Sequence, residues 1–416
     1  MHNLYIEGEN LVVLRQLKEK FGCQVNVIYI DPPYNTGHDG LYRDRWEETE
    51  WRQMMKERLS AGRELLREDG VQFISIDHHE LTALAEVCDE VFGRENRIGL
   101  VTVVNNLKGR SDDRFFATCN EFLLVYAKDR DQLQLKGFVL ADEELDADYG
   151  GEDNRGRYKL VPLKKSGKAW RREDRPGMFY PIVEKNGKLG TFGEAELKSL
   201  YDEKRQTFHD DCIEQLTADY EQQGYRVVWP RKKNGEWGRW RWGIKTFLSR
   251  KDTELEINKA GIVCTKMRAL LENGGLRLKT AKTLWYKPEY DTGSAADSLG
   301  ELMGDRDVFV NAKSVELLKD VLRISTDENS LVLDYFSGSA TTAQAVVELN
   351  AEDGGSRRFV LVQEVVATPT NSVARKLGYQ TICEIGEERI RRVGRILKDK
   401  NTGNEATDVE FQIIKM

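Results

Sequence analysis

Short apolar runs alternate with amphipathic stretches along the first 127 residues. Residues 25–30 form a mostly apolar, β-branched run that stops at Asp31-Pro32-Pro33, which predicts a buried parallel strand. Apolar side chains at helical spacing predict a helix over 48–67, which Asp69-Gly70 closes. The same pattern predicts strands over 71–76, 98–104 and 122–126 and a helix over 80–92. Strands that alternate with helices indicate a mostly parallel sheet covered on both faces.

The middle of the chain loses this rhythm, and the last part regains it. Residues 128–305 contain many glycines and six of the eight tryptophans without a regular period, which indicates an inserted domain of irregular or α+β build. Strands are expected again over 331–333 and 359–362, with helices around 315–322, 343–347 and 384–398. We therefore predict an α/β sheet built from residues 1–127 and 306–400, with an inserted domain over 128–305 and a tail over 401–416.

The composition is that of an ordinary globular protein. The chain has 416 residues, of which 40% are hydrophobic, and this is enough for two or three domains with sizeable cores. No apolar stretch approaches the ~18 residues of a membrane span, and the first residues are polar, so we expect a cytoplasmic protein without membrane association. Six widely spaced cysteines without a C-x-x-C argue against a zinc cluster or a disulfide framework.

The charge is unevenly distributed along the chain. The formal net charge is -7, yet residues 155–175 contain nine Lys/Arg against two Asp/Glu, and residues 231–250 contain seven against one. Such segregation favours a surface that faces a polyanion, although a solvated face is the simpler alternative. Residues 237–242 (WGRWRW) interleave aromatic and cationic side chains, which suits either nucleic-acid contact or a small β-rich core.

The sequence Asp31-Pro32-Pro33-Tyr34 directly follows a predicted strand. The exocyclic amine of a nucleobase is a poor nucleophile, and a catalyst can activate it by drawing its hydrogens toward two acceptors. The Asp31 carboxylate and the Pro32 carbonyl, held in place by the two prolines, would supply such a pair. Tyr34 would offer a flat face for stacking a base turned out of its helix. For these four residues alone, a stiff turn that ends a strand is an equally good interpretation.

A second cluster of interest lies near the end of the chain. Residues 333–342 run from a predicted strand through a turn of small side chains into a helix, whose N-terminal N–H groups suit a carboxylate. The next strand ends in Gln363-Glu364, where an acidic side chain would hold a ribose diol. A tight loop without a ligand would give the same pattern, and the sequence contains neither a P-loop nor an H-E-x-x-H motif.

Together these segments resemble the β-class amino methyltransferases of DNA, and most closely the modification (Mod) subunits of type III restriction-modification systems and their solitary relatives. In that class a catalytic D-P-P-Y precedes an F-x-G-x-G element, and a target recognition domain lies between them. The resemblance extends over nearly the whole chain. The matching phrases are 28–37 (IYIDPPYNTG), 73–77 (FISID), 336–343 (FSGSATTA), 358–363 (RFVLVQ) and 382–386 (ICEIG).

The resemblance implies a Rossmann-like sheet that binds S-adenosylmethionine, without a metal. It implies that the catalytic residues are Asp31, Pro32, Pro33 and Tyr34. The residues against the methionine part of the donor would be Asp334, Phe336, Gly338, Ser339 and Thr341, with Glu364 or Gln363 at its ribose and Glu9 near its adenine. Lys313 would begin a helix of the family's K-P-x-E-L-L type, and Ala340 replaces the last glycine of F-x-G-x-G.

The function implied is methyl transfer to N6 of an adenine flipped out of double-stranded DNA. N4 of cytosine needs the same acceptors and is the nearest alternative, whereas a non-catalytic DNA-binding or specificity subunit and an RNA substrate are more distant ones. A homodimer and a restriction subunit stay open as partners. The side chains expected at the DNA are Arg171, Arg172, Arg239, Trp240, Arg241 and Lys108, the last in a loop over 105–111. We expect His78 and His79 to start a helix rather than bind a metal, and Arg389 to lie on a solvated face.

Overall fold

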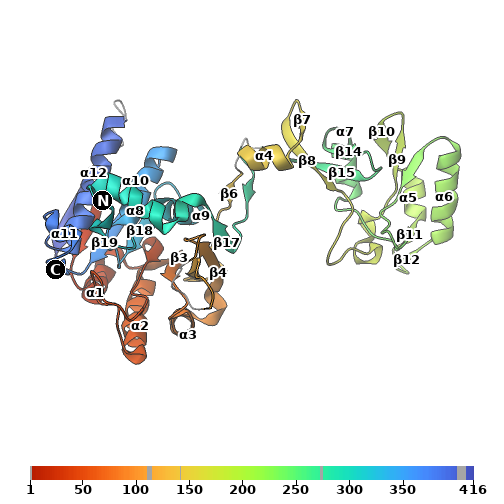
Figure 1. Ribbon diagram of the computed structural model, residues 1–416. Coiled ribbons are helices and arrows are strands. Elements are labelled where there is room, and N and C mark those ends of the chain that lie inside the picture. Colours follow the sequence, from red (N-terminus) through yellow and green to blue (C-terminus); the bar gives the residue numbers. More distant parts are fainter. Residues whose placement is uncertain (1, 110–114, 141, 272–274, 401–408) are drawn as a thin grey trace. The chain divides into compact units, whose positions relative to one another are not determined.

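Two separate units make up the computed structural model, which describes residues 2–109, 115–140, 142–271, 275–400 and 409–416 (Figure 1). The first unit combines Met1–Phe138 with Lys279–Met416, and the second is the intervening Val139–Leu278. The boundaries predicted at 128 and 305 therefore need correction. Residues 279–305 belong to the first unit because β17 (Leu284–Tyr286) pairs with its sheet and α8 (Thr292–Met303) packs in one of its cores.

The sheet of the first unit has the strand order β17-β4-β5-β3-β2-β18-β19-β1-β20. All neighbours are parallel except β5, which pairs antiparallel with both β3 and β4. The other bounds are β1 (Asn3–Glu7), β2 (Val25–Ile30), β3 (Leu66–Ile76), β4 (Arg97–Val104), β5 (Asn120–Ala127), β18 (Leu331–Asp334), β19 (Arg358–Gln363) and β20 (Phe411–Lys415). The prediction of one α/β sheet from both chain ends is confirmed. The expected tail is corrected, because β20 forms the edge strand beside β1, whereas 401–408 lie outside the described residues.

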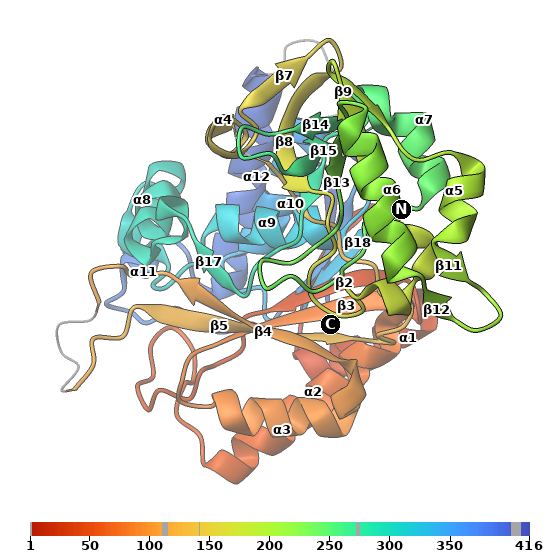
Figure 2. The ribbon, with the colours of Figure 1, turned by 90° about the vertical axis from the view of Figure 1, so that its right-hand side faces the viewer.

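Helices cover both faces of this sheet (Figure 2). Along β2, Ile28 and Ile30 enter one core while Val27 and Tyr29 enter the other, as the alternation of a doubly covered strand requires. The helices on the first face are α1 (Asn10–Phe21), α2 (Glu48–Leu65) and α3 (Leu81–Phe92), and those on the second are α9 (Val315–Ser325), α10 (Thr341–Asp353) and α12 (Ile382–Lys400). Short helices complete the unit: η1 (Arg94–Asn96), η4 (Pro288–Tyr290), η5 (Arg306–Val308) and α11 (Val373–Lys376). Among the described helices, none combines the length and apolarity needed to cross a bilayer.

Two strands from distant parts of the sequence lie side by side in the centre of the sheet. β2 pairs in parallel with β18, with Val27 opposite Val332 and Ile28 opposite Leu333. Parallel neighbours end at the same edge of a sheet, which is where α/β proteins place their ligands. Asp31 directly follows β2 and Asp334 ends β18, so the two motifs found in the sequence meet at one edge.

The second unit has an α+β build. Its sheets are antiparallel: a four-stranded sheet β14-β15-β8-β7, a three-stranded sheet β10-β9-β13 and the hairpin β11-β12. The strands are β7 (Gly151–Asp153), β8 (Gly156–Pro162), β9 (Ile182–Lys185), β10 (Lys188–Gly190), β11 (Tyr201–Asp202), β12 (Thr207–Phe208), β13 (Arg226–Val228), β14 (Leu255–Ile257) and β15 (Val263–Arg268). The helices are α4 (Asp142–Asp148), η2 (Arg172–Asp174), η3 (Pro176–Met178), α5 (Glu194–Ser199), α6 (Asp210–Gln222) and α7 (Ile244–Glu254). The short strands β6 (Phe138–Val139) and β16 (Leu278–Lys279) lie where the chain passes between the units.

Candidate active site

Two neighbouring cavities in the first unit share Asp31 in their walls. The larger cavity has a volume of about 420 Å³ and contains seven of the eight predicted donor residues together with Pro33. The smaller cavity has a volume of about 260 Å³ and contains Pro32 and Tyr34. The seven residues in the larger cavity are Asp334, Phe336, Gly338, Ser339, Thr341, Gln363 and Glu364.

The loop that carries the D-P-P-Y sequence is held by its own surroundings. Asn35 has a left-handed backbone with φ 60°, and the Asp44 carboxylate accepts the N–H groups of Asn35 (2.8 Å) and Thr36 (3.2 Å). The indole N–H of Trp51 donates to the Pro33 carbonyl at 2.9 Å. These bonds fix the loop after β2 before any ligand enters.

Two acceptors at the start of this loop are left without hydrogen bonds. The Oδ1 atom of Asp31 is buried and has no hydrogen-bond partner, although the Lys313 ammonium lies 3.4 Å away. No hydrogen bond from the described residues reaches the Pro32 carbonyl. Burial raises the pKa of Asp31 to about 6, against the opposing effect of Lys313, and the Glu121 carboxylate adds to the rise. Asp31 is therefore a more basic carboxylate than usual, and it is ionised at neutral pH.

A buried cation fixes the tyrosine of the motif. Lys313 donates to the Tyr34 hydroxyl at 2.7 Å and pairs with Glu121 at 2.5 Å, while that hydroxyl donates to Glu121 at 3.2 Å. Burial lowers the pKa of Lys313, but the carboxylates of Asp31 and Glu121 outweigh this effect and the net shift is upward. Lys313 therefore stays charged, and the Tyr34 ring is held beside the smaller cavity. Sequence analysis named Lys313 only as a helix start and missed Glu121.

The turn after β18 is equally well braced. The Asp334 carboxylate accepts the Thr342 hydroxyl at 2.6 Å and the Phe336 N–H at 3.0 Å, and burial raises the pKa of Asp334 to about 7. Gly338 has φ +50°, and its N–H donates to Oε1 of Gln363 at 2.7 Å. The Gln363 side-chain oxygen already accepts the Gly338 N–H. The exposed Glu364 is therefore the better candidate for accepting a hydrogen bond from a ligand hydroxyl.

Comparison with known proteins assigns the family. Residues 25–395 match the family model described as DNA methylase. The chain belongs to this DNA methylase family. It is 34% identical over 446 residues to the type III restriction-modification enzyme EcoPI Mod subunit of Escherichia phage P1, covering 99% of this chain and 65% of that subunit. It is 30% identical to the type II methyltransferase M.KpnI of Klebsiella pneumoniae, covering 94% and 87%. A putative DNA modification methylase from Thermus thermophilus aligns over 100% of both chains with 11% identity and a TM-score of 0.38. The family match and the identity to the EcoPI Mod subunit confirm the resemblance to Mod subunits.

Within this methylase fold, Glu9 does not line the larger cavity, and its expected place near the donor's adenine stays a prediction. Its carboxylate accepts the Val12 N–H at 2.9 Å, as the N-cap of α1, and forms an ion pair with Arg58. The next residue, Asn10, does line the cavity, and its amide donates to the Tyr335 carbonyl at 3.0 Å.

Three of the side chains expected at DNA are instead buried in the second unit. Arg172 is 7% exposed, pairs with Asp210 at 2.6 Å and lies over the Phe208 ring. Arg239 is 6% exposed and bonds backbone carbonyls, and Trp240 is 3% exposed with its indole N–H on the Tyr180 carbonyl. Their assignment to DNA contact is corrected to packing, because a side chain enclosed in this way cannot reach a phosphate. The remaining three, Arg171, Arg241 and Lys108, are exposed.

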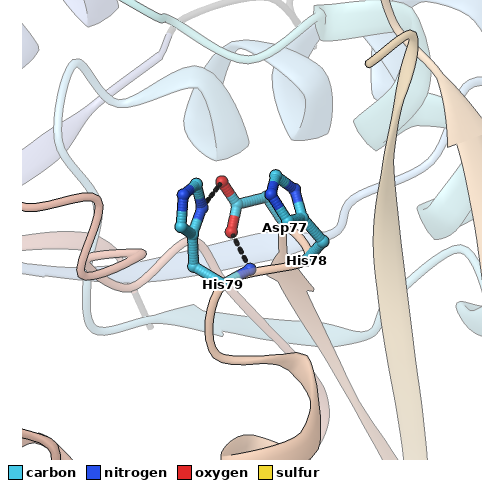
Figure 3. A group of neighbouring side chains, drawn as sticks. All are labelled: Asp77, His78 and His79. Carbon is cyan, nitrogen blue, oxygen red and sulfur yellow. Dashed lines mark hydrogen bonds and ion pairs between the residues drawn. The ribbon is translucent and has the colours of Figure 1, made fainter. Parts of the chain in front are cut away.

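Asp77, His78 and His79 form a compact group at the start of α3 (Figure 3). Their potential ligand atoms all lie within 4.8 Å of one another. Both carboxylate oxygens of Asp77 contact His79: one accepts its backbone N–H at 2.9 Å and the other lies 2.8 Å from its Nδ1. Asp77 therefore holds the turn that precedes α3, which begins at Leu81. That the two histidines bind no metal stays a prediction.

Proposed function

We propose that this protein transfers a methyl group from S-adenosylmethionine to N6 of an adenine flipped out of duplex DNA. The observation that carries the proposal is the position of the Asp31 carboxylate, which pairs with Lys313 but accepts no hydrogen bond at Oδ1, in the wall common to the two cavities. A donor in the larger cavity and a base in the smaller one would meet at this residue. Family membership and similarity to a protein named as a Mod subunit support the same reaction.

The side chains around Asp31 suit amine activation. The Asp31 carboxylate and the Pro32 carbonyl would each accept one hydrogen of the amine, which localises the nitrogen lone pair for attack on the methyl carbon. S-adenosylmethionine, when bound, would supply an electrophilic methyl group on a sulfonium, whose sulfur would keep the electron pair of the broken carbon–sulfur bond and become a thioether. The amine then carries one proton too many, and Asp31, with a pKa of about 6, can take it and pass it to water. No covalent enzyme intermediate is required.

The residues of the larger cavity fit such a donor. Phe309 and Phe336 provide an apolar wall, and Glu364 is placed for a hydroxyl pair. The Ser337 hydroxyl is buried without a partner, and α10 begins without a side-chain cap, so donors remain for a carboxylate at this end. The chain therefore retains the groups that a specificity subunit without donor binding would not need.

The residue before Pro-Pro-Tyr bears on which base is methylated. An Asp before Pro-Pro-Tyr favours adenine in the family, whereas N4 of cytosine presents the same amine geometry and is the alternative product. The smaller cavity, lined by the half-buried Tyr34, also contains Asn105, the first residue of the loop expected over the base. Arg110 and Ser111 of that loop lie outside the described residues.

We further propose that the second unit recognises the DNA target. Lys164, Lys165, Lys232 and Lys233 line a surface hollow in it, and Arg171 and Arg241 are exposed. Such a surface suits contacts with DNA phosphates, which position a protein on the duplex. A homodimer, a restriction subunit partner and a cytoplasmic location stay as predictions, because the chain covers 65% of the EcoPI subunit's length.

The test is direct. Purified protein is incubated with methyl-labelled S-adenosylmethionine and mixed-sequence duplex DNA, which is then digested to nucleosides. Label in N6-methyladenine is expected. Label in N4-methylcytosine alone would assign the alternative base, and unlabelled DNA with normal DNA binding would favour a non-catalytic subunit.

A further inference from the structure

Arg389, in α12, is a buried cation directly behind the turn that lines the larger cavity. Sequence analysis expected it on a solvated face, but the residue is only 2% exposed. Its guanidinium donates to Oε1 of Gln344 at 2.7 Å, to Oγ of Ser339 at 2.9 Å and to Oγ1 of Thr341 at 2.7 Å. It also donates to the Ser339 carbonyl at 3.2 Å. All four acceptors are neutral.

A buried charge without an anion needs an explanation. Among the ion pairs of the described residues, none includes Arg389, whereas its neighbours Arg391 and Arg392 pair with Glu387 and Glu388. Burial lowers the pKa of Arg389 to about 10, opposed by the more distant Glu348. An arginine nonetheless remains protonated at neutral pH. The fold therefore keeps a buried positive charge beside a cavity without a direct ion pair, since Glu348 reaches it only through the Gln344 amide. Buried charges are costly unless they are paired.

The hydrogen bonds of Arg389 also determine how two hydroxyl groups are oriented. A hydroxyl oxygen that accepts from a guanidinium must direct its own hydrogen elsewhere. Ser339 and Thr341 both line the larger cavity, and their hydroxyl oxygens lie 3.5 Å apart, at the limit for a bond between them. Even if one donates to the other, at least one hydroxyl hydrogen remains for the cavity.

Two further groups belong to the same turn, which lines the cavity. The Ser337 hydroxyl, on a residue 5% exposed, has no hydrogen-bond partner. α10 begins at Thr341, and its N-cap, Ala340, provides no side-chain bond, so the first N–H groups of this 13-residue helix are open. Oriented hydroxyls, open N–H groups and a positive charge behind them are the features of an anion subsite.

We propose that Arg389 is a positioning residue for an anion subsite at the Ser337–Thr341 turn, where the carboxylate of the donor's amino acid part binds. This inference rests on the proposed function. Arg389 does not touch the ligand: it orients the Ser339 and Thr341 hydroxyls toward the carboxylate and supplies the compensating charge. The carboxylate in turn adds a negative charge near a guanidinium that has no direct ion pair among the described residues.

The experiment compares two ligands that differ only in this carboxylate. Dissociation constants of S-adenosylmethionine and of its decarboxylated analogue are measured by calorimetry for the full chain, for Arg389→Gln and for Arg391→Gln. Arg391 is on the same helix, but its side chain is 44% exposed, so its variant is the matched control for loss of one charge. In Arg389→Gln, affinity for S-adenosylmethionine should fall about tenfold or more, which is about 1.4 kcal/mol, and affinity for the analogue should change less than about threefold. The control should change neither.

An equal loss for both ligands would show that Arg389 only secures α12, and an unchanged S-adenosylmethionine affinity would show that it has no role; either result overturns the inference. If Arg389→Gln does not fold, Thr341→Val makes the same comparison, since it removes one oriented hydroxyl at nearly constant volume. A selective loss of S-adenosylmethionine affinity in that variant supports the inference, and an equal or absent loss overturns it. Failure of the unmodified chain to bind either ligand would instead remove the proposed function, and the inference with it.

Discussion

Replacing Asp31 with Asn should reduce activity and increase stability together. The variant keeps the shape of the side chain but removes its charge and its capacity to take a proton. Loss of one preorganised electrostatic contact in an active site typically costs about 10²–10³ in kcat, and loss of a general base adds to this. We expect kcat for DNA methylation to fall by at least about 10², whereas the dissociation constants for donor and DNA stay within about threefold.

The stability change follows from the pKa of the buried carboxyl. Burial raises the pKa of Asp31 from its ordinary 3.8 to about 6, so ionisation of this group opposes folding. Above pH 7 the raised pKa lowers the free energy of unfolding by about 3 kcal/mol. This penalty develops as the pH rises from about 4 to 6. It is absent at lower pH, where the carboxyl is protonated in both the folded and the unfolded state. Asp31→Asn removes this cost. Its free energy of unfolding should therefore exceed that of the unmodified chain, by about 1.4 kcal/mol more at pH 8 than at pH 5.

Urea unfolding at pH 5 and pH 8, together with single-turnover methylation, measures both effects. The matched control is Asp69→Asn, because the Asp69 side chain is 46% exposed and pairs with Arg67 on the surface. Retained methylation, or DNA affinity that falls by the same factor as kcat, would refute the role given to Asp31. A variant less stable than the unmodified chain at pH 8 would refute the electrostatic reasoning.

Four further variants test other parts of the structure. Lys313→Met removes the cation that lowers the pKa of Asp31, so the rising limb of the kcat–pH profile should move to higher pH; an unshifted profile would contradict this. Gly338→Ala places a side chain at φ +50°, which should cost about 1–2 kcal/mol in a thermal melt and weaken donor binding in calorimetry, and full retention of both would count against the assigned turn. Arg172→Ala should destabilise the protein by about 2–4 kcal/mol in urea unfolding, through the lost ion pair and ring contacts. Arg171→Ala should leave stability unchanged and lower the salt dependence of DNA binding by about one phosphate contact. If instead Arg171→Ala destabilised the protein and Arg172→Ala affected only DNA binding, the roles given to these two arginines would be wrong.

Local patterns were sufficient to predict the central strands and the two motifs. The bounds of β2, Val25–Ile30, agree with the predicted run because an apolar segment stopped by two prolines has few alternatives. The edge strands were not predicted, because their sequence pattern allows several interpretations. Leu284 and Tyr286 of β17 are 59% and 51% exposed, and the pattern of such short, half-exposed strands resembles that of a loop.

Contacts between distant residues could not be predicted from one sequence. Glu121 and Lys313 are 192 positions apart, and nothing in either local pattern indicates that they pair. The same limit applies to Trp240 and Arg239, because alternating aromatic and cationic residues describe a nucleic-acid surface and a small packed core equally well. Burial distinguishes the two, and burial depends on the neighbours that the fold supplies.

The geometry of the site depends on which strands are adjacent, and the order of the motifs along the chain follows from where the second unit is inserted. β2 lies between β3, the next strand in the sequence, and β18, which comes after the insertion. The chain leaves for the second unit after β5 and re-enters the sheet as β17, at the edge of the sheet, with three strands between β17 and β2. A change in the length of the inserted segment therefore acts on an edge strand, while the pairing of Val27 with Val332, which brings Asp31 and Asp334 to one edge, is set by the buried centre. This separation lets the second unit change its sequence without disturbing the two cavities.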